Sequence, residues 1–253
     1  MLKDFTKEKF DIIIQAGQSN SEGYGVGPVD EPYQPRDDVW YLNGDFTISQ
    51  AAERVTGNEI HGTFALPFAA EYINAGLLKE GRKLLILRTA EGGTGFLTGE
   101  WGMSDRLYLR MMKMIRTALD MNPENRLVCM LWHQGENEVE KKASFDVHYE
   151  NLSTLVRSVQ DEFNAHDVPF IAGDFVQGWK AINEEACVPV VEAGRAVCKE
   201  CKRGAFVETD GLKSNIDELL RKTCGWEDPI HFSRKSLYTL GKRYFDAFAE
   251  LIK

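Results

Sequence analysis

The chain has 253 residues, and its hydrophobic and charged fractions of 43% and 27% are those of a globular protein with a full core, which excludes a disordered chain or a fibrous repeat. Its net charge is −9 with the acidic residues scattered, which argues against nucleic acid or a membrane surface as a partner, because both attract clustered positive charge. No composition break divides the chain, so we expect one domain over residues 1–253.

The N-terminal segment and the cysteines bear on location. Residues 1–10 are charged and lack the apolar stretch of a secretory signal, and no later window is apolar enough to span a bilayer. The five cysteines are odd in number and irregularly spaced, which is typical of reduced thiols and not of a disulfide framework. We therefore expect a cytoplasmic protein.

Short apolar runs alternate with longer segments of helical period, which predicts βαβ units around a mostly parallel sheet. The predicted strands are residues 10–16, 83–88, 127–133, 168–172 and 205–208. The predicted helices are residues 64–78, 104–120, 145–163, 182–202 and 233–252. We expect an α/β fold, a three-layer αβα sandwich with a central, mostly parallel five-stranded sheet.

Residues 24–63 do not fit this alternation. They hold three of the eight prolines and one predicted hairpin, in which Asn43 and Gly44 join residues 39–42 to 46–48 through a two-residue type I′ turn. An irregular excursion of this length usually shapes a site and not a core. We expect a long insertion that borders the functional site.

Four polar blocks follow or adjoin the predicted strands, where ligands gather in an open parallel sheet. The blocks are GQSN at 17–20, EGGTG at 91–95, HQGE at 133–136 and DPIH at 228–231. A strand-end serine such as Ser19 is often only a helix cap, and Asp228 with His231 could form only a local cap or ion pair. Together they offer a nucleophile, a base and an orienting carboxylate, which is the set that acyl transfer needs.

Acyl transfer also needs hydrogen-bond donors around the carbonyl oxygen that becomes negative. The sequence offers the N–H of Ser19, a backbone N–H from Gly92 or Gly93, and the side-chain amide of Gln134. The alternative for the glycines is a tight turn, and for Gln134 a hydrogen bond to a loop.

These blocks, in this order, resemble the SGNH (GDSL-like) hydrolase superfamily, and within it the carbohydrate-esterase branch that includes sialate O-acetylesterases and acetylxylan esterases. The resemblance rests on GQSN at 17–20, GGT at 92–94, Trp101, QGE at 134–136, D-x-x-H-F at 228–232 and G-x-R at 241–243. It covers nearly the whole chain. Ser21 stands where the family often has methionine, and residues 61–63 lack a proline-containing pattern, so the preferred substrate is less well defined than the chemistry.

The resemblance implies a flavodoxin-like fold and a metal-independent esterase without a cofactor, which removes O-acetyl groups from carbohydrates through an acetyl-enzyme intermediate. Its partner would be a small-molecule or oligosaccharide acetyl ester, and a homo-oligomer is compatible with the sequence. The implied roles are nucleophile for Ser19, base and then acid for His231, orienter for Asp228, oxyanion donors for Ser19, Gly93 and Gln134, and substrate binding or support for Gln18, Glu136 and Trp101. Support is the more expected role for Glu136, whereas Trp101 and Trp226 are expected to contact substrate.

Two rival functions remain open. One keeps the fold but takes a lipid, an aryl ester or an acyl thioester, and the other is a non-catalytic carbohydrate-binding relative. The α/β-hydrolase fold is disfavoured because position 21 is serine where its nucleophile elbow requires glycine.

Other residues with chemical potential are given structural roles. Cys198 and Cys201 lack a second pair at metal-ligand spacing, so no metal site is expected there. We expect His133 to be a hydrogen-bonded support, and His148 and His166 to lie on the surface of a helix.

Overall fold

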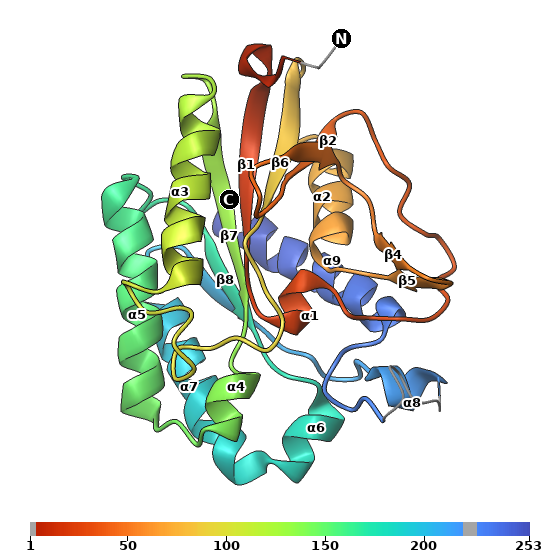
Figure 1. Ribbon diagram of the computed structural model, residues 1–253, viewed down its shortest axis with the longest axis vertical. Helices are drawn as coiled ribbons and strands as arrows, with labels where there is room; N and C mark the ends of the chain where they lie inside the picture. The colour runs from red at the N-terminus through yellow and green to blue at the C-terminus, as the bar shows by residue number, and fades with distance from the viewer. Residues whose placement is uncertain (1–3, 220–226) are drawn as a thin grey trace.

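The computed structural model describes residues 4–219 and 227–253, and it shows a sheet between two layers of helices (Figure 1). The middle of strand β1 (Lys9–Gly17) explains this arrangement. Ile13 packs into the core on one face of the sheet, whereas Ile12 and Ile14 pack into the core on the other face, and all three are fully buried. A strand that is apolar on both faces requires helices on both sides.

Within the described residues, seven strands form the main sheet, in the order β3-β2-β6-β1-β7-β8-β9. All neighbouring strands are parallel except β2 and β3. The remaining strands of the sheet are β2 (Val39–Leu42), β3 (Ile48–Gln50), β6 (Arg82–Arg88), β7 (Arg126–His133), β8 (Phe170–Gly173) and β9 (Gly204–Val207). The five predicted strands all form, but the prediction of a five-stranded sheet is wrong because the hairpin adds β2 and β3 to it.

The predicted hairpin forms with a different turn. Residues 43–47 connect β2 to β3, because the N–H of Phe46 donates to Asn43 O at 2.8 Å and the N–H of Asn43 donates to Thr47 O at 2.9 Å. Phe46 has φ of 67° and so takes the left-handed conformation. The predicted type I′ turn would have required that conformation at Asn43 and Gly44. A second hairpin, β4 (Arg54–Thr56) and β5 (Glu59–His61), completes the 24–63 segment.

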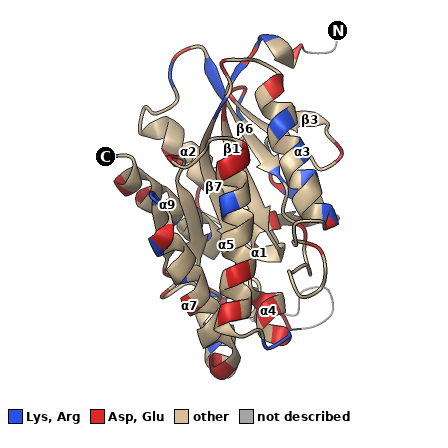
Figure 2. Ribbon diagram, turned by 90° about the vertical axis from the view of Figure 1, so that its left-hand side faces the viewer, with Lys and Arg blue, Asp and Glu red and all other residues tan. Residues whose placement is uncertain are grey.

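Helices α2 (Ala65–Asn74) and α9 (Arg234–Leu251) cover one face of the sheet, and α3 (Arg106–Asp120) and α5 (Phe145–Glu162) cover the other (Figure 1). Figure 2 shows basic and acidic residues side by side on the outer helices. Within the described residues, no helix is both long and apolar enough to cross a membrane. The other helices are α1 (Ser19–Glu22), α4 (Glu136–Glu140), α6 (Gln177–Ile182), α7 (Glu184–Glu200), α8 (Asn215–Leu219) and the 3₁₀ turn Phe5–Lys7.

A buried carboxylate connects three neighbouring strands at the amino ends of the parallel strands. Asp11 is fully buried and accepts hydrogen bonds from Arg82 at 2.7 Å, Arg126 at 2.6 Å and the hydroxyl of Tyr72 at 2.8 Å. Burial alone would raise the pKa of Asp11, but the bonds from Arg126, Tyr72 and Arg82 together lower it below its usual value. The ionised form is therefore the one that the fold stabilises.

The Asp11→Asn variant should lower the free energy of unfolding at pH 7 by about 3 kcal/mol, because it leaves two arginines without their buried partner. Since the folded pKa of Asp11 lies below the unfolded value of about 4, its contribution is complete above that value and is lost as the pH falls through the folded pKa. Urea unfolding of the wild type and the variant from pH 7 to pH 3 measures this difference, which should shrink at the acidic end.

Asp167→Asn is the matched control, because Asp167 pairs with Lys202 on the surface, where both side chains are about two-thirds exposed. Its effect should be much smaller than that of Asp11→Asn, because water screens an ion pair between exposed side chains. Equal losses in the two variants would contradict the role given to Asp11.

Candidate functional site

The turn that carries Ser19 lies directly against the end of strand β7. The N–H of Gln18 donates to the carbonyl oxygen of His133 at 3.0 Å, and a Cβ atom on Gly17 would come within 2.1 Å of that oxygen. Gly17 also has φ of 125°, so the position admits only glycine without strain. The chain then enters helix α1 at Ser19, which is 5% exposed.

Asp228 and His231 are hydrogen-bonded to each other. The Nδ1 atom of His231 lies 3.0 Å from Oδ2 of Asp228, and the backbone N–H of His231 donates to Oδ1 at 3.1 Å. Asn215 also donates to Oδ2, at 2.7 Å. Burial alone would raise the pKa of Asp228, but the hydrogen bond and charge of His231 and the hydrogen bond from Asn215 lower it. The carboxylate is therefore ionised, and it holds the Nδ1 atom of His231. The Nε2 atom is left as the ring nitrogen that can exchange a proton.

Asn20 brings the histidine segment to the serine turn. Its side-chain oxygen accepts the N–H of Phe232 at 3.0 Å, and its side-chain nitrogen donates to Ile230 O at 3.1 Å. The two residues that flank His231 are thus bound to the residue next to Ser19. The sequence alone predicts no role for Asn20, although it is the last residue of the GQSN block.

Part of the 24–63 segment lies against the histidine. The ring of Tyr24 stacks on the imidazole of His231, with centroids 5.0 Å apart and planes inclined by 22°. The guanidinium carbon of Arg54 lies 4.9 Å from the centroid of the Tyr24 ring, and Arg54 donates to Gly23 O at 3.3 Å. An aromatic ring therefore borders the imidazole, a cation lies against that ring, and neither could be assigned from local sequence.

The two candidate glycine donors differ in their surroundings. The N–H of Gly92 donates to the carboxylate of Glu22 at 2.7 Å, so it is already engaged. Gly93 has φ of 71°, and a Cβ atom there would meet open space. Among the described residues, the N–H of Gly93 has no hydrogen-bond partner, which leaves it as the donor of this pair that can serve an oxyanion.

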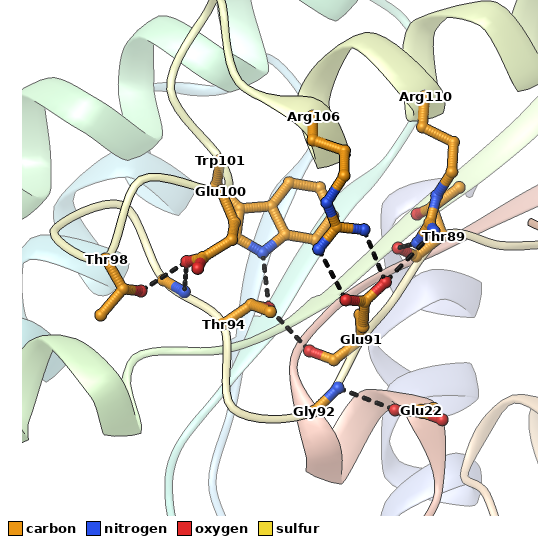
Figure 3. Close-up of polar contacts among 11 residues, drawn as sticks. Glu22, Thr89, Glu91, Gly92, Thr94, Thr98, Glu100, Trp101, Arg106 and Arg110 are labelled. Carbon is orange, nitrogen blue, oxygen red and sulfur yellow. Dashed lines mark hydrogen bonds and ion pairs between the residues drawn. The ribbon is translucent and has the colours of Figure 1, made fainter.

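Trp101 does not face the site, so the expectation of a substrate contact is wrong. Its side chain is fully buried, packs edge-to-face on Trp132 at 5.1 Å, and donates from Nε1 to the hydroxyl of Thr94 at 3.1 Å. Thr94 in turn donates to Glu91 O at 2.6 Å, and Glu91 is ion-paired with Arg106 (Figure 3). Trp101 therefore supports the 91–95 loop from within.

The amide of Gln134 is held by three acceptors. Its nitrogen lies 3.2 Å from Oε1 of Gln18 and 3.4 Å from Thr94 O, and it also donates to the carboxylate of Glu138. Since an amide nitrogen carries two hydrogens, the bond to Glu138 uses one and leaves the other near two long, weak contacts. That second hydrogen is therefore the less firmly held of the two.

Glu138, on helix α4, belongs to the site although no sequence motif predicts it. Its Oε1 accepts the N–H groups of Phe96 at 2.6 Å and Leu97 at 3.3 Å, while Oε2 accepts Gln134. Burial raises the pKa of this carboxyl, against the opposing effect of those hydrogen bonds. The only signal in the sequence is an acidic residue four positions after Gln134.

Gln18 and Glu136 bind protein groups. Besides Gln134, Oε1 of Gln18 lies 3.3 Å from the N–H groups of Gly135 and Asn137. Glu136 is almost fully buried and accepts a hydrogen bond from Asn20 at 2.7 Å, and burial raises its pKa. Both side chains are placed as supports of the turns that carry Ser19 and Gln134.

The remaining predicted residues lie as follows. His133 is fully buried, its Nδ1 lies 3.0 Å from the hydroxyl of Tyr244, and burial lowers its pKa to about 3. His148 is buried, so the prediction of a surface position is wrong, because α5 turns it toward Phe96. His166 is exposed, just beyond the end of α5, and Trp226 lies outside the described residues.

The Cys198–Cys201 pair spans the end of α7, and burial raises the pKa of the Cys198 thiol to about 12. Within residues 4–219 and 227–253, no group of three or more His, Cys, Asp or Glu side chains is placed to hold a metal ion.

Comparison with known proteins gives relatives over most of the chain. It is 25% identical over 173 residues to a "Probable 9-O-acetyl-N-acetylneuraminic acid deacetylase" of Escherichia coli strain K12, covering 59% of this chain and 50% of that protein. It is 24% identical over 220 residues to a probable carbohydrate esterase of Arabidopsis thaliana, covering 79% of this chain and 82% of the relative. The chain thus spans half the length of the bacterial relative.

The fold is similar to that of solved structures over nearly the whole chain. The crystal structure of NanS superimposes with a TM-score of 0.81 at 18% identity, covering 97% of this chain and 98% of that one. The structure of the Arabidopsis thaliana protein superimposes with a TM-score of 0.72 at 20% identity, covering 95% and 98%. Residues 9–250 match the family described as carbohydrate esterase, sialic acid-specific acetylesterase. The chain therefore belongs to this carbohydrate esterase family.

Proposed function

We propose that this protein is a serine esterase that removes O-acetyl groups from carbohydrates through an acetyl-enzyme intermediate. The observation that carries the proposal is the hydrogen-bonded Asp228–His231 pair, which Asn20 holds beside the turn of Ser19. A serine hydroxyl is a weak nucleophile until an oriented base accepts its proton, and this arrangement supplies that base. Family membership and the two esterase relatives support the substrate class.

The chemistry follows from these positions. The Oγ atom of Ser19 attacks the acetyl carbonyl while Nε2 of His231 takes the hydroxyl proton, and the imidazolium formed is stabilised by the carboxylate of Asp228. The C–O bond to the sugar then breaks, and His231 returns the proton to the sugar oxygen. A water molecule, deprotonated by the same nitrogen, attacks the carbonyl carbon of the acetyl-enzyme. The bond from that carbon to Oγ of Ser19 then breaks, His231 returns the proton to Oγ, and acetate leaves.

Three donors would hold the negative oxygen of each tetrahedral intermediate. They are the N–H of Ser19, the N–H of Gly93 and the second hydrogen of the Gln134 amide. Each such donor is worth about 3 to 4 kcal/mol of barrier when it acts in a site shielded from water. Glu138 holds one hydrogen of the amide, so the other, which makes only long contacts to Gln18 and Thr94, is the one that would bind the oxyanion.

Ser19→Ala should abolish acetate release from an aryl acetate and prevent labelling by a serine-reactive fluorophosphonate, since the hydroxyl that would carry the acetyl group is removed. The thermal unfolding midpoint should stay within a few degrees of the wild type, because the change removes one oxygen atom. Turnover or labelling that persists in the variant would show that another residue is the nucleophile.

Acetyl esters should be turned over with a kcat/KM roughly 100-fold higher than octanoyl esters, because Ser19 is only 5% exposed and a long chain must be accommodated beside it. A nitrophenyl ester series from two to eight carbons measures this ratio. Equal or better turnover of the octanoate would favour the lipid esterase rival. If acetyl esters are preferred, a comparison of acetate release from O-acetyl sialic acids and from acetylated xylo-oligosaccharides identifies the sugar.

Asn20→Ala should lower kcat by about 100-fold with little change in KM, because the segment around His231 loses both of its bonds to the serine turn. The matched control is Asn122→Ala, which also removes an asparagine bonded to backbone groups, those of Thr6 and Glu124, at the opposite end of the sheet. The control should keep wild-type kinetics. Unchanged kcat in Asn20→Ala would mean that the histidine is held by other contacts.

A further inference from the structure

A small internal cavity lies beneath Gln134, between the end of β7 and helix α5. Its volume is about 10 Å³ for the centre of a water-sized sphere. Three polar residues line it, Trp132 and Gln134 from the end of β7 and His148 from α5, and its other lining residues are apolar or glycine. About 10 to 15 Å³ is the smallest such volume that holds one water molecule.

Each of these three residues has one buried polar atom without a hydrogen-bond partner among the described residues. The atoms are Nε1 of Trp132, Oε1 of Gln134 and Nδ1 of His148. Buried polar groups in folded proteins are nearly always paired, with protein or with ordered water. The three unpaired atoms thus belong to the three polar residues that line this one cavity, and a single bound molecule there would explain all of them.

The chemistry of the three atoms matches a single water. The indole N–H is only a donor, and the amide oxygen is only an acceptor. Burial lowers the pKa of His148 to about 4, so its imidazole is neutral at pH 7 and Nδ1 can accept a hydrogen bond. A water molecule accepts one hydrogen bond and donates two in this arrangement.

We propose that one buried water molecule bridges Trp132, Gln134 and His148, and that it fixes the amide orientation on which the proposed oxyanion donor depends. The water donates a hydrogen bond to Oε1 of Gln134, while Gln18 and Glu138 accept hydrogen bonds from the amide nitrogen. The amide then has one orientation, with both hydrogens directed away from the cavity. Trp132 and His148 are positioning residues, since they act through Gln134, and this part rests on the proposed function.

The water site is tested directly by a crystal structure of the wild-type enzyme at about 1.5 Å resolution. We expect one peak of density within about 2.7 to 3.2 Å of all three atoms. A cavity without density, or one closed by direct pairing of the three side chains, would overturn the proposal whatever the activity of the enzyme.

The positioning role is tested by a pair of substitutions at His148. His148→Asn keeps a polar acceptor near the position of Nδ1 and should stay within about threefold of wild-type kcat, whereas His148→Leu removes the acceptor and should lower kcat by about tenfold. The KM for an aryl acetate should change less than twofold in both. A loss of the same size in both variants would contradict a role for the hydrogen bond.

Combining His148→Leu with Gln134→Ala separates positioning from a general loss of structure. With the amide absent, His148→Leu should cause no further loss of kcat, because the two changes remove the same interaction. Additive losses would overturn the positioning role. Full activity of Gln134→Ala alone would refute the oxyanion role, and the water site would then be decided by the crystal structure. Trp132→Phe, which deletes only the N–H donor and some ring area, provides the second variant should His148→Leu fail to fold.

Discussion

The side chain of Asn20 joins two parts of the chain that are 212 residues apart, and the candidate site depends on this contact. Its two functional atoms bind the backbone on both sides of His231, while a third bond to Glu136 holds the amide itself. A single amide therefore sets the position of a histidine relative to a serine turn. Because backbone groups are the partners, the position does not depend on which side chains occupy the flanking residues.

The surroundings of the acidic groups of the site shift their pKa values in different directions. Asp228 is kept ionised by its hydrogen bonds, whereas burial favours the neutral forms of Glu136 and Glu138. In the proposed reaction, a full negative charge near the oxyanion donors would oppose the charge that forms on the acetyl oxygen. Glu136 and Glu138 thus accept hydrogen bonds where burial disfavours their charge, whereas Asp228 lies beside the imidazole that would become a cation in that reaction.

Much of the fold could be predicted because central parallel strands must be apolar on both faces. Continuous apolar runs such as Ile12–Ile14 indicate strands of this kind. Strand β3, with the sequence Ile-Ser-Gln, carries no such pattern, and its place in the sheet is set by its pairing with β2. The motif residues were predictable by resemblance. The burial of Trp101 and His148 was not, because it depends on packing against Trp132 and Phe96 from distant segments.

The lengths of the outer strands have a further consequence. On one side the sheet ends at β3 with three residues, and on the other at β9 with four. An exposed sheet edge can pair with the edge of another molecule, and longer edges offer more unpaired N–H and C=O groups for such pairing. With both edges this short, two copies gain few intermolecular backbone bonds by meeting edge to edge, so the fold resists β-mediated aggregation.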